Sequence, residues 1–354
     1  MTNLQKLQTS MKQNGVDALL ITELTNVQWV SGFRGSAGVV IATTNDARFI
    51  SDGRYTIAAA EQVKDMPTFT YQRAMKLDEF IAQHIREMNI HSIGFESENV
   101  SYKRWSTLAE TLAGIQLVPT PDIISALRMI KTESEIKAIK EACKLADAGF
   151  DHILKLIQPG VSEYDLNLEL EFFIRRHNAG LAFDPIVVSG ANSAMPHGKA
   201  TEKKLQKGDF LTMDFGANLN GQCSDLTRTV VVGECSERSC EIYNAVLKSQ
   251  LAAIDAMKPG AKAHDIDAIS REAMGELSEF FTHGLGHGLG SVVHDAGRLA
   301  NNSTDVIEVN QVWTVEPGVY IPDFGGVRIE DDVLITENGA ELLTFAPKEL
   351  LVLP

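Results

Sequence analysis

The clearest pattern of apolar and polar positions in the chain begins at residue 133. Apolar side chains recur there at alternating steps of three and four, the period of one helix face. These side chains are Ile136, Ile139, Cys143, Ala146, Phe150, Ile153 and Ile157. Thr132 and Glu135 have the spacing of a capping box, and Gln158-Pro159-Gly160 ends the pattern. The sequence therefore predicts a helix over 133–157, followed by a second helix from Ser162 to His177.

Residues 1–120 alternate between strand-like and helix-like patterns. Leu4, Leu7 and Met11 indicate a short amphipathic helix. Apolar runs predict strands at 17–22, 38–43, 47–52, 92–96 and 115–119, and periodic stretches predict helices at 54–63, 77–88 and 102–113. This order is typical of an α/β domain, and Pro119 and Pro121 should end its last strand. We expect one domain over 1–125 and a second over 126–354.

The second domain contains an internal sequence repeat at an offset of 100 residues. LIQPGVSEYDLNLELEFFI (156–174) aligns with AMKPGAKAHDIDAISREAM (256–274), so that Pro159-Gly160 matches Pro259-Gly260. Each copy joins two helix-like stretches and is followed by a pair of strands that carries carboxylates. The repeat predicts two related helix–helix–hairpin units whose sheets meet at a shared cleft.

The first carboxylate pair lies on a predicted β-hairpin. FLTMDFGA and a run that ends in TRTVVV flank Asn220-Gly221, a two-residue turn signal. That turn places Asp214 opposite Thr227 and Gly216 opposite Asp225, so both aspartates project to the same side. Aspartate is depleted from strand interiors, and two facing aspartates repel each other unless a cation lies between them. Gly216 would leave room for that ion.

The second carboxylate pair repeats this design less definitely. VWTVEPGVYI and GVRIEDDVLI flank the turn-rich residues 322–326. Glu316 and Glu330 face the same way only if the loop has an odd number of residues, for example one centred on Asp323. The sequence leaves that register open.

A histidine-rich stretch lies between the two carboxylate pairs. His283 and His287 alternate with glycines at 284, 286, 288 and 290, and four glycines in seven residues disfavour a helix. We expect an extended segment whose bare face lets backbone approach an ion or a substrate. Two further histidines, His294 and the one in Pro196-His197-Gly198, complete the set of candidate imidazoles. One histidine is usually structural, but three within twelve residues indicate a site.

Five candidate ligands emerge from these motifs: Asp214, Asp225, His287, Glu316 and Glu330. Four carboxylates and one imidazole suit two divalent ions such as Mn²⁺, Co²⁺ or Zn²⁺ better than a thiolate-rich structural zinc. The net charge of −15 argues against nucleic acid or an anionic membrane as partner. Four cysteines without a CxxC pair, and the absence of a signal-peptide pattern or a long apolar run, favour a cytoplasmic protein with reduced thiols.

At these residues the sequence resembles the pita-bread metallopeptidase family, in its Xaa-Pro branch of aminopeptidase P and prolidase. The matching segments are PHG (196–198), MDFGA (213–217), SDLTRT (224–229), GHGLG (286–290), VEPGVY (315–320) and GGVRIEDD (325–332). The resemblance covers essentially the whole chain. It implies a creatinase-like α/β domain, then a pita-bread catalytic domain with a pseudo-twofold internal repeat, an α/β (α+β) class overall, and a homodimer. Asp295 after His294 departs from the glutamate that is common there.

The resemblance also implies roles for individual residues. The five candidate ligands would hold two ions, most simply Mn²⁺, with Asp225 and Glu330 bridging them. His197 and His294 would act in catalysis and, with His283, line the substrate pocket, while Arg328 would support the site. Arg298 is a candidate for binding the product carboxylate, although a solvated arginine is as reasonable.

Charge then predicts the reaction. Two divalent ions that share a water would lower its pKa and present hydroxide to the scissile carbonyl of a proline-containing peptide. Glu316 is the candidate for proton transfer to the leaving nitrogen. The first expectation is an Xaa-Pro aminopeptidase, with an Xaa-Pro dipeptidase as the alternative. Methionine aminopeptidase and a non-catalytic pita-bread binding protein are more distant alternatives.

Overall fold

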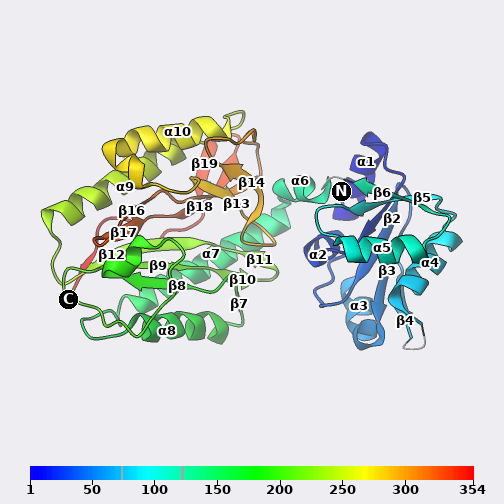
Figure 1. Ribbon diagram of the computed structural model, residues 1–354, viewed down its shortest axis with the longest axis horizontal. Coiled ribbons are helices and arrows are strands. Elements are labelled where there is room, and N and C mark those ends of the chain that lie inside the picture. Colours follow the sequence, from blue (N-terminus) through cyan, green and yellow to red (C-terminus); the bar gives the residue numbers. More distant parts are fainter. Residues whose placement is uncertain (73–74, 121–122) are drawn as a thin grey trace. The chain divides into compact units, whose positions relative to one another are not determined.

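The computed structural model describes residues 1–72, 75–120 and 123–354, which divide into two compact units, Met1–Arg128 and Met129–Pro354 (Figure 1). None of the described helices is long and apolar enough to cross a membrane. The cysteines are free thiols, as expected. Pro121, which should help to end the last strand of the first domain, lies outside the described residues.

The first unit is built around a six-stranded sheet of mixed direction. Its strands, in spatial order, are β4 (Thr68–Tyr71), β3 (Ala47–Asp52), β2 (Val39–Thr43), β1 (Ala18–Ile21), β5 (Ser92–Glu96) and β6 (Gln116–Thr120). Alternate residues of β1 enter different cores: Leu19 and Ile21 face one, while Ala18 and Leu20 face the other. Both faces of the sheet are therefore buried, which explains why its strands read as nearly continuous apolar runs.

Helices cover this sheet: α1 (Asn3–Gln13), α2 (Leu24–Ser31), α3 (Thr56–Gln62), α4 (Leu77–Glu87), α5 (Tyr102–Thr111) and α6 (Ile123–Met129). The helices and strands predicted over residues 17–120 agree with the structure to within two residues at either end. Two elements in this stretch, α2 and β4, escaped prediction. The signal for the end of α2 is Gly32, which adopts the left-handed conformation with φ 78° that favours glycine after a helix.

The second unit contains two helix pairs, α7 (Glu133–Ile153) with α8 (Glu163–Arg176) and α9 (Glu237–Ala256) with α10 (Ala263–Met274). One four-stranded sheet has the order β20 (Val352–Leu353), β12 (Leu226–Val232), β9 (Phe210–Phe215), β8 (Ile186–Ser189). A five-stranded sheet has the order β14 (Asp295–Leu299), β13 (Gly286–Gly288), β15 (Val312–Val315), β18 (Asp331–Thr336), β19 (Gly339–Leu342).

Smaller ladders extend the two hairpins: β11 (Gln222–Cys223), β10 (Ala217–Leu219) and β7 (Gly180–Leu181) form one, and β16 (Gly318–Ile321) and β17 (Gly325–Arg328) form the other. Figure 1 shows the strands of this unit between the α9–α10 pair on one side and α8 on the other. Each helix pair packs on its own core, so the two halves are built in the same way.

The internal repeat predicted from the sequence is confirmed in the backbone. Gly160 and Gly260 both adopt positive φ, 92° and 85°, between the two helices of each pair. The amide of Gly160 donates to the carbonyl of Leu205, and the amide of Gly260 donates to the carbonyl of Ile307. Because a Pro-Gly turn both stops the first helix and pairs with a later segment, the same short motif recurs in both halves.

The capping box of α7 is present, since the Thr132 hydroxyl accepts from the Glu135 amide and the Glu135 carboxylate accepts from the Thr132 amide. The helix nevertheless ends at Ile153, not at the predicted residue 157. Pro159 would clash with the carbonyl of residue 155 in a continuous helix. The chain instead tightens, and Leu156 donates to Ile153 three residues back.

Candidate active site

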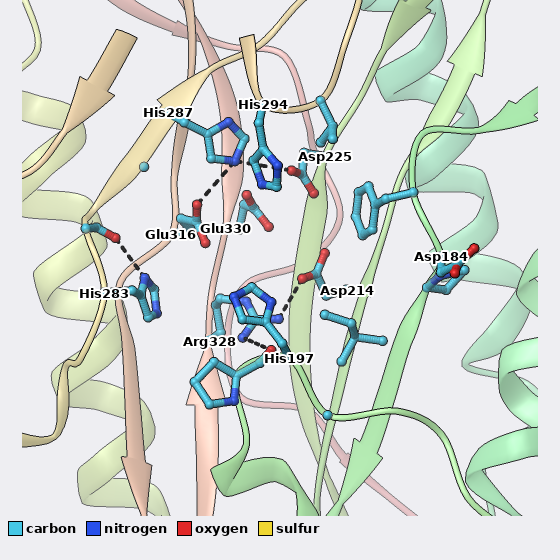
Figure 2. A pocket seen from close by; sticks show the side chains of 18 of the residues that line it. Asp184, His197, Asp214, Asp225, His283, His287, His294, Glu316, Arg328 and Glu330 are labelled. Atoms are coloured by element: carbon cyan, nitrogen blue, oxygen red, sulfur yellow. Dashed lines mark hydrogen bonds and ion pairs between the residues drawn. The ribbon is translucent and has the colours of Figure 1, made fainter. Parts of the chain in front are cut away.

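A cavity of about 950 Å³ lies in the second unit, and every site residue that the sequence singled out lines it. These residues are His197, Asp214, Asp225, His283, His287, His294, Arg298, Glu316, Arg328 and Glu330. Figure 2 shows the carboxylates of Asp225, Glu316 and Glu330 turned toward one another and toward His287. Four separate segments of the chain therefore bring the predicted residues to one pocket.

The aspartate hairpin has the register that its turn predicts. Asn220 and Gly221 both have positive φ, 55° and 78°, as a two-residue hairpin turn of this kind requires. Asp214 pairs with Thr227 across β9 and β12. The expected role of Gly216 is wrong, however. A side chain there would lie 2.0 Å from the Ser224 carbonyl oxygen, so the glycine makes room for the neighbouring backbone and not for an ion.

The glutamate hairpin resolves the register that the sequence left open. Ile321 pairs with Gly325 and Gly318 pairs with Arg328, so the loop has three residues centred on Asp323. Asp323 takes the left-handed conformation with φ 61°. Glu316 and Glu330 consequently lie opposite each other, in the gap between the β15–β18 and β16–β17 ladders. The loop therefore has an odd number of residues, which is the condition for the two glutamates to face the same way.

His287 lies on β13 in an extended segment, as the glycine spacing predicts. Its Nδ1 lies 3.0 Å from the Gly288 carbonyl oxygen, which makes Nδ1 the protonated nitrogen and leaves Nε2 as an acceptor. Nε2 faces Glu316 Oε1 at 3.4 Å and Asp225 Oδ2 at 3.7 Å. One ligand atom each from His287, Asp225 and Glu330 lies within 4.8 Å of the others, a spacing that could hold a metal ion.

The glycines on either side of His287 make room for the backbones of neighbouring strands. A side chain on Gly286 would lie 2.1 Å from the Thr314 carbonyl oxygen, and one on Gly288 would lie 1.8 Å from the carbonyl oxygen of Ala296. The bare face of this segment therefore admits the backbones of β15 and β14. Gly284 and Gly286 also line the cavity, so the approach of this face to an ion or a substrate stays a prediction.

The chemistry of the pocket fits bound cations. Oδ1 of Asp214 and Oδ1 of Asp225 are both buried, and neither has a hydrogen-bond partner among the described residues. Burial and the nearby Glu330 raise the pKa of Asp225 well above its usual range, and burial with Glu316 does the same to the pKa of Glu330. Burial raises the pKa of Glu316 to about 8. Divalent cations would relieve both the repulsion and the unmet acceptors.

The imidazole of His287 suits this role because it is held neutral. Burial lowers its pKa to about 4, so at neutral pH its lone pair on Nε2 is available to a metal ion. An oxygen-rich set with one neutral imidazole is the ligand chemistry expected for Mn²⁺, Co²⁺ or Zn²⁺.

Arg328 organises the other side of the cluster. Its Nη2 donates to Asp214 Oδ2 at 2.6 Å, and its Nε donates to Thr227 Oγ1 at 3.1 Å. The Thr227 hydroxyl in turn donates to Glu330 Oε2 at 2.6 Å. One guanidinium and one hydroxyl therefore fix an oxygen of each of two candidate ligands. The sequence placed Thr227 on the correct face but assigned it no role.

Tyr320 is a residue of the site that the sequence analysis missed. Its hydroxyl accepts from Arg328 Nη1 at 2.9 Å and lies 2.8 Å from His283 Nε2. His283 Nδ1 lies 2.7 Å from the Gly284 carbonyl oxygen, so Nδ1 carries the proton and Tyr320 donates to Nε2. Both nitrogens of His283 are therefore occupied by protein groups. Tyr320 ends the VEPGVY motif, a signal that could have drawn attention to it.

Three basic groups lie at the open part of the cavity. His197, His294 and Arg298 are all exposed and line the pocket. The ring of His294 packs edge-on against His287 with centroids 4.4 Å apart. Burial, with the nearby His197 imidazole and Arg298 guanidinium, lowers the pKa of His294. Asp295, the departure noted in the sequence, turns to the Lys131 ammonium at 3.6 Å.

One wall of the cavity was not foreseen at all. Helix α8 contributes Tyr164, Asn167 and Glu171, which recur at helical spacing, and the segment before β8 contributes Phe183 and Asp184. Asn167 Nδ2 donates to Glu171 Oε1 at 2.9 Å. No local pattern in the sequence distinguishes these residues from an ordinary solvated helix face.

Comparison with known proteins places the chain in a family. The model of metallopeptidase family M24 matches residues 137–337, and the model of the Creatinase/Prolidase N-terminal domain matches residues 3–130. An Xaa-Pro dipeptidase of Pyrococcus furiosus is 36% identical over 98% of this chain and 99% of its own length.

Solved structures agree with this placement. An Xaa-Pro dipeptidase from Bacillus anthracis is 42% identical, with a TM-score of 0.96 over 99% of each chain. An X-Pro aminopeptidase from Thermotoga maritima is 32% identical, with a TM-score of 0.91 over 98% of this chain and 100% of that one. The fold is the pita-bread fold behind a creatinase-type domain, as the sequence predicted. The chain belongs to metallopeptidase family M24.

Proposed function

We propose that this protein is an Xaa-Pro dipeptidase that holds two divalent ions with the five candidate ligands, Asp214, Asp225, His287, Glu316 and Glu330. The observation that carries the proposal is their convergence on one cavity in which two carboxylate oxygens lack partners among the described residues. Mn²⁺ is the first candidate, and Co²⁺ or Zn²⁺ would also suit this ligand set. Bound ions would supply Lewis-acid polarisation of the scissile carbonyl and acidify a water.

Glu316 is the group that we assign to proton transfer. Its side chain is 17% exposed, so it reaches the cavity while most of it is shielded from solvent. A carboxylate in that place takes the proton of the attacking water and delivers it to the proline nitrogen as the bond breaks. The hydroxyl of Thr314, 3.4 Å from Glu316 Oε1, helps to orient the carboxylate.

The basic groups at the open part of the cavity would bind the substrate. His197 and His294 offer imidazole N–H groups to the carbonyl oxygen as negative charge develops on it. An Xaa-Pro bond has no amide hydrogen at proline, so selection for proline must come from the shape of the pocket. Arg298 is the cation that we assign to the free carboxylate of the dipeptide. Two relatives named as dipeptidases support this choice.

An Xaa-Pro aminopeptidase is the second candidate, and it was the first expectation from the sequence. The volume of about 950 Å³ favours it, since the cavity is near the upper limit of roughly 1,000 Å³ for pockets that enclose drug-sized ligands. The wall formed by α8 and Phe183 would then accommodate residues beyond proline.

Three substrates with one shared N-terminal residue test the proposal: Ala-Pro, Ala-Pro-amide and Ala-Pro-Ala, assayed in the presence of Mn²⁺. A dipeptidase should cleave Ala-Pro with a kcat/KM at least about tenfold higher than the other two, a difference of about 1.4 kcal/mol in transition-state binding. Arg298→Gln should remove that preference and Arg298→Lys should keep part of it. Equal cleavage of Ala-Pro-Ala would favour the aminopeptidase, and cleavage of none of the three would refute the proposed substrate class.

A further inference from the structure

Among the described residues, the carboxylate that accepts the most hydrogen bonds belongs to Glu163, in the first turn of α8. Its side chain is fully buried, with an exposed fraction of 0%. Oε1 accepts from the amide of Ser189 at 2.7 Å and from the Ser189 hydroxyl at 2.8 Å. Oε2 accepts from the amide of Thr201 at 3.0 Å and from the Thr201 hydroxyl at 2.7 Å. Asn192 Nδ2 lies within 3.4 Å of both oxygens.

These partners stand at the two ends of one segment. Ser189 is the last residue of β8, and Thr201 closes the following segment, 190–200, which carries His197. One carboxylate therefore ties together both ends of the segment, one oxygen to each end. The amide of Glu163 itself donates to the Lys203 carbonyl, which continues the attachment past Thr201.

The middle of the segment is also held in place. The Ser193 hydroxyl donates to the Gly190 carbonyl at 2.6 Å and accepts from the amide of Gly326 at 2.8 Å. Gly326 lies on β17, two residues before Arg328. The segment is thus hydrogen-bonded to α8 at both ends and to the glutamate hairpin at its centre. His197, which lies between Ser193 and Thr201, lines the cavity.

We propose that Glu163 is a positioning residue that sets the place of His197 in the active site by closing segment 190–200. The proposal rests on the proposed function for the role of His197 in catalysis. The carboxylate does not touch the substrate pocket, since it is buried and does not line the cavity. It acts through the backbone of Ser189 and Thr201.

The other half of the repeat uses the same device one helical turn later. Asp267 on α10 is fully buried and accepts from the amide of Leu285 at 3.2 Å. It also pairs with Arg271 at 2.8 Å, and Arg271 donates to the carbonyl of His283 at 2.6 Å. In each half, a buried carboxylate on the second helix therefore holds the backbone of a segment that brings a histidine to the pocket. The recurrence in both halves of the repeat supports a positioning role.

The arrangement requires a carboxylate specifically. Each oxygen of Glu163 faces a backbone N–H, which can only donate. In Glu163→Gln, the amide nitrogen must replace one of the oxygens, and its hydrogens would point at the N–H of either Ser189 or Thr201. The hydroxyl of Ser189 or Thr201 could rotate to accept a hydrogen bond from the glutamine, but a backbone N–H cannot accept one. The substitution preserves volume and breaks the attachment at one end of the segment.

Hydrogen–deuterium exchange of the full-length protein with Mn²⁺ bound gives a test that does not depend on activity. In E163Q the amides of residues 189–201 should exchange at least about tenfold faster, while those of α9 and α10 keep the parent rate. Ser249→Ala is the matched control, because it removes a buried hydroxyl bond to Ser270 between α9 and α10. Unchanged exchange over 189–201 in E163Q would overturn the proposal.

Kinetics then test the link to His197. With Ala-Pro as substrate, E163Q should lower kcat/KM by about 10–100-fold with bound Mn²⁺ unchanged, as expected for a catalytic group displaced by a fraction of an ångström. In a His197→Ala background, the same change should cost less than about threefold. A full effect in that background would show that Glu163 acts elsewhere and would overturn the proposal.

Poor folding of E163Q and failure of the proposed function can each be distinguished from failure of the positioning role. If E163Q folds poorly, Thr201→Val removes one hydroxyl bond to Glu163 and should accelerate exchange over 189–201 in the same direction. If the parent protein cleaves no Xaa-Pro peptide, the proposed function fails, whereas the exchange result still decides whether Glu163 fixes the segment.

Discussion

In the metal-free protein, Glu316 makes stability depend on pH in a direction that is unusual for a carboxylate. Its pKa of about 8 in the folded chain, against an ordinary 4.5, means that the folded state binds a proton more tightly than the unfolded state. The stability associated with this proton is present below pH 4.5 and is lost as the pH rises through 8. Asp225 and Glu330 have raised pKa values and act in the same direction.

The best window for the measurement is pH 6.5–8. Burial lowers the pKa values of His283 and His287 to about 4, so these groups make stability rise with pH only up to their ordinary value of 6.5. Above that pH Glu316 acts without them, and each pH unit corresponds to 1.36 kcal/mol per proton. The Glu316 proton alone should then lower the free energy of unfolding by about 2 kcal/mol across the window, which lowers Tm by about 4–8 °C for a unit of this size.

Calorimetry in EDTA at pH 6.5, 7.2 and 8.0 measures this loss, with Glu316→Gln as the control because glutamine does not titrate. The difference between the slopes of the two proteins therefore measures Glu316 together with its effect on the pKa values of Glu330 and Asp225. Mn²⁺ should restore Tm most strongly at pH 8, since the ions occupy the place of the protons. Identical slopes for the two proteins in EDTA, or a parent protein that gains stability as the pH rises, would refute this reasoning.

Two substitutions test the ligand set and the histidine beside it. Asp225→Ala should abolish hydrolysis of Ala-Pro and reduce the Mn²⁺ bound per chain, and turnover at normal metal content would contradict its assignment as a ligand. His294→Ala should lower kcat by about 100-fold with bound Mn²⁺ unchanged, as for loss of one group that stabilises the oxyanion. Metal analysis decides that case, because loss of both ions would instead make His294 a ligand.

The elements that sequence analysis placed correctly are those with local determinants. The register of the aspartate hairpin follows from Asn220-Gly221 because both residues tolerate positive φ and the side-chain period of a strand is two. The register of the glutamate hairpin could not be predicted, because the turn-rich residues 322–326 allow several loops. Its register depends on the left-handed conformation of Asp323, which aspartate adopts only in a favourable context.

The errors concern what lies across space from a residue. Glycines at 216, 286 and 288 were correctly recognised as points of close approach, but the approaching group is the backbone of a neighbouring strand. A sequence does not reveal whether an ion or a carbonyl fills the space that a missing side chain leaves. Tyr320 and the α8 wall of the cavity escaped for the same reason, because their contacts come from segments distant in the chain.

Strand pairing is interrupted at Asp225 in one carboxylate hairpin and at Glu316 and Glu330 in the other, and hydrogen bonds join the two hairpins at these interruptions. The amide of Asp225, which has no strand partner there, donates to Asp332 Oδ2 in the glutamate hairpin at 2.9 Å. The amide of Glu330 donates to the Thr227 carbonyl in the aspartate hairpin at 3.1 Å. Each hairpin therefore supplies an acceptor for a backbone amide of the other, a side-chain oxygen in one case and a carbonyl oxygen in the other, so the two carboxylate pairs hold each other in place. The ligand geometry is therefore a property of the joined halves, and the pseudo-twofold repeat places the site at their junction.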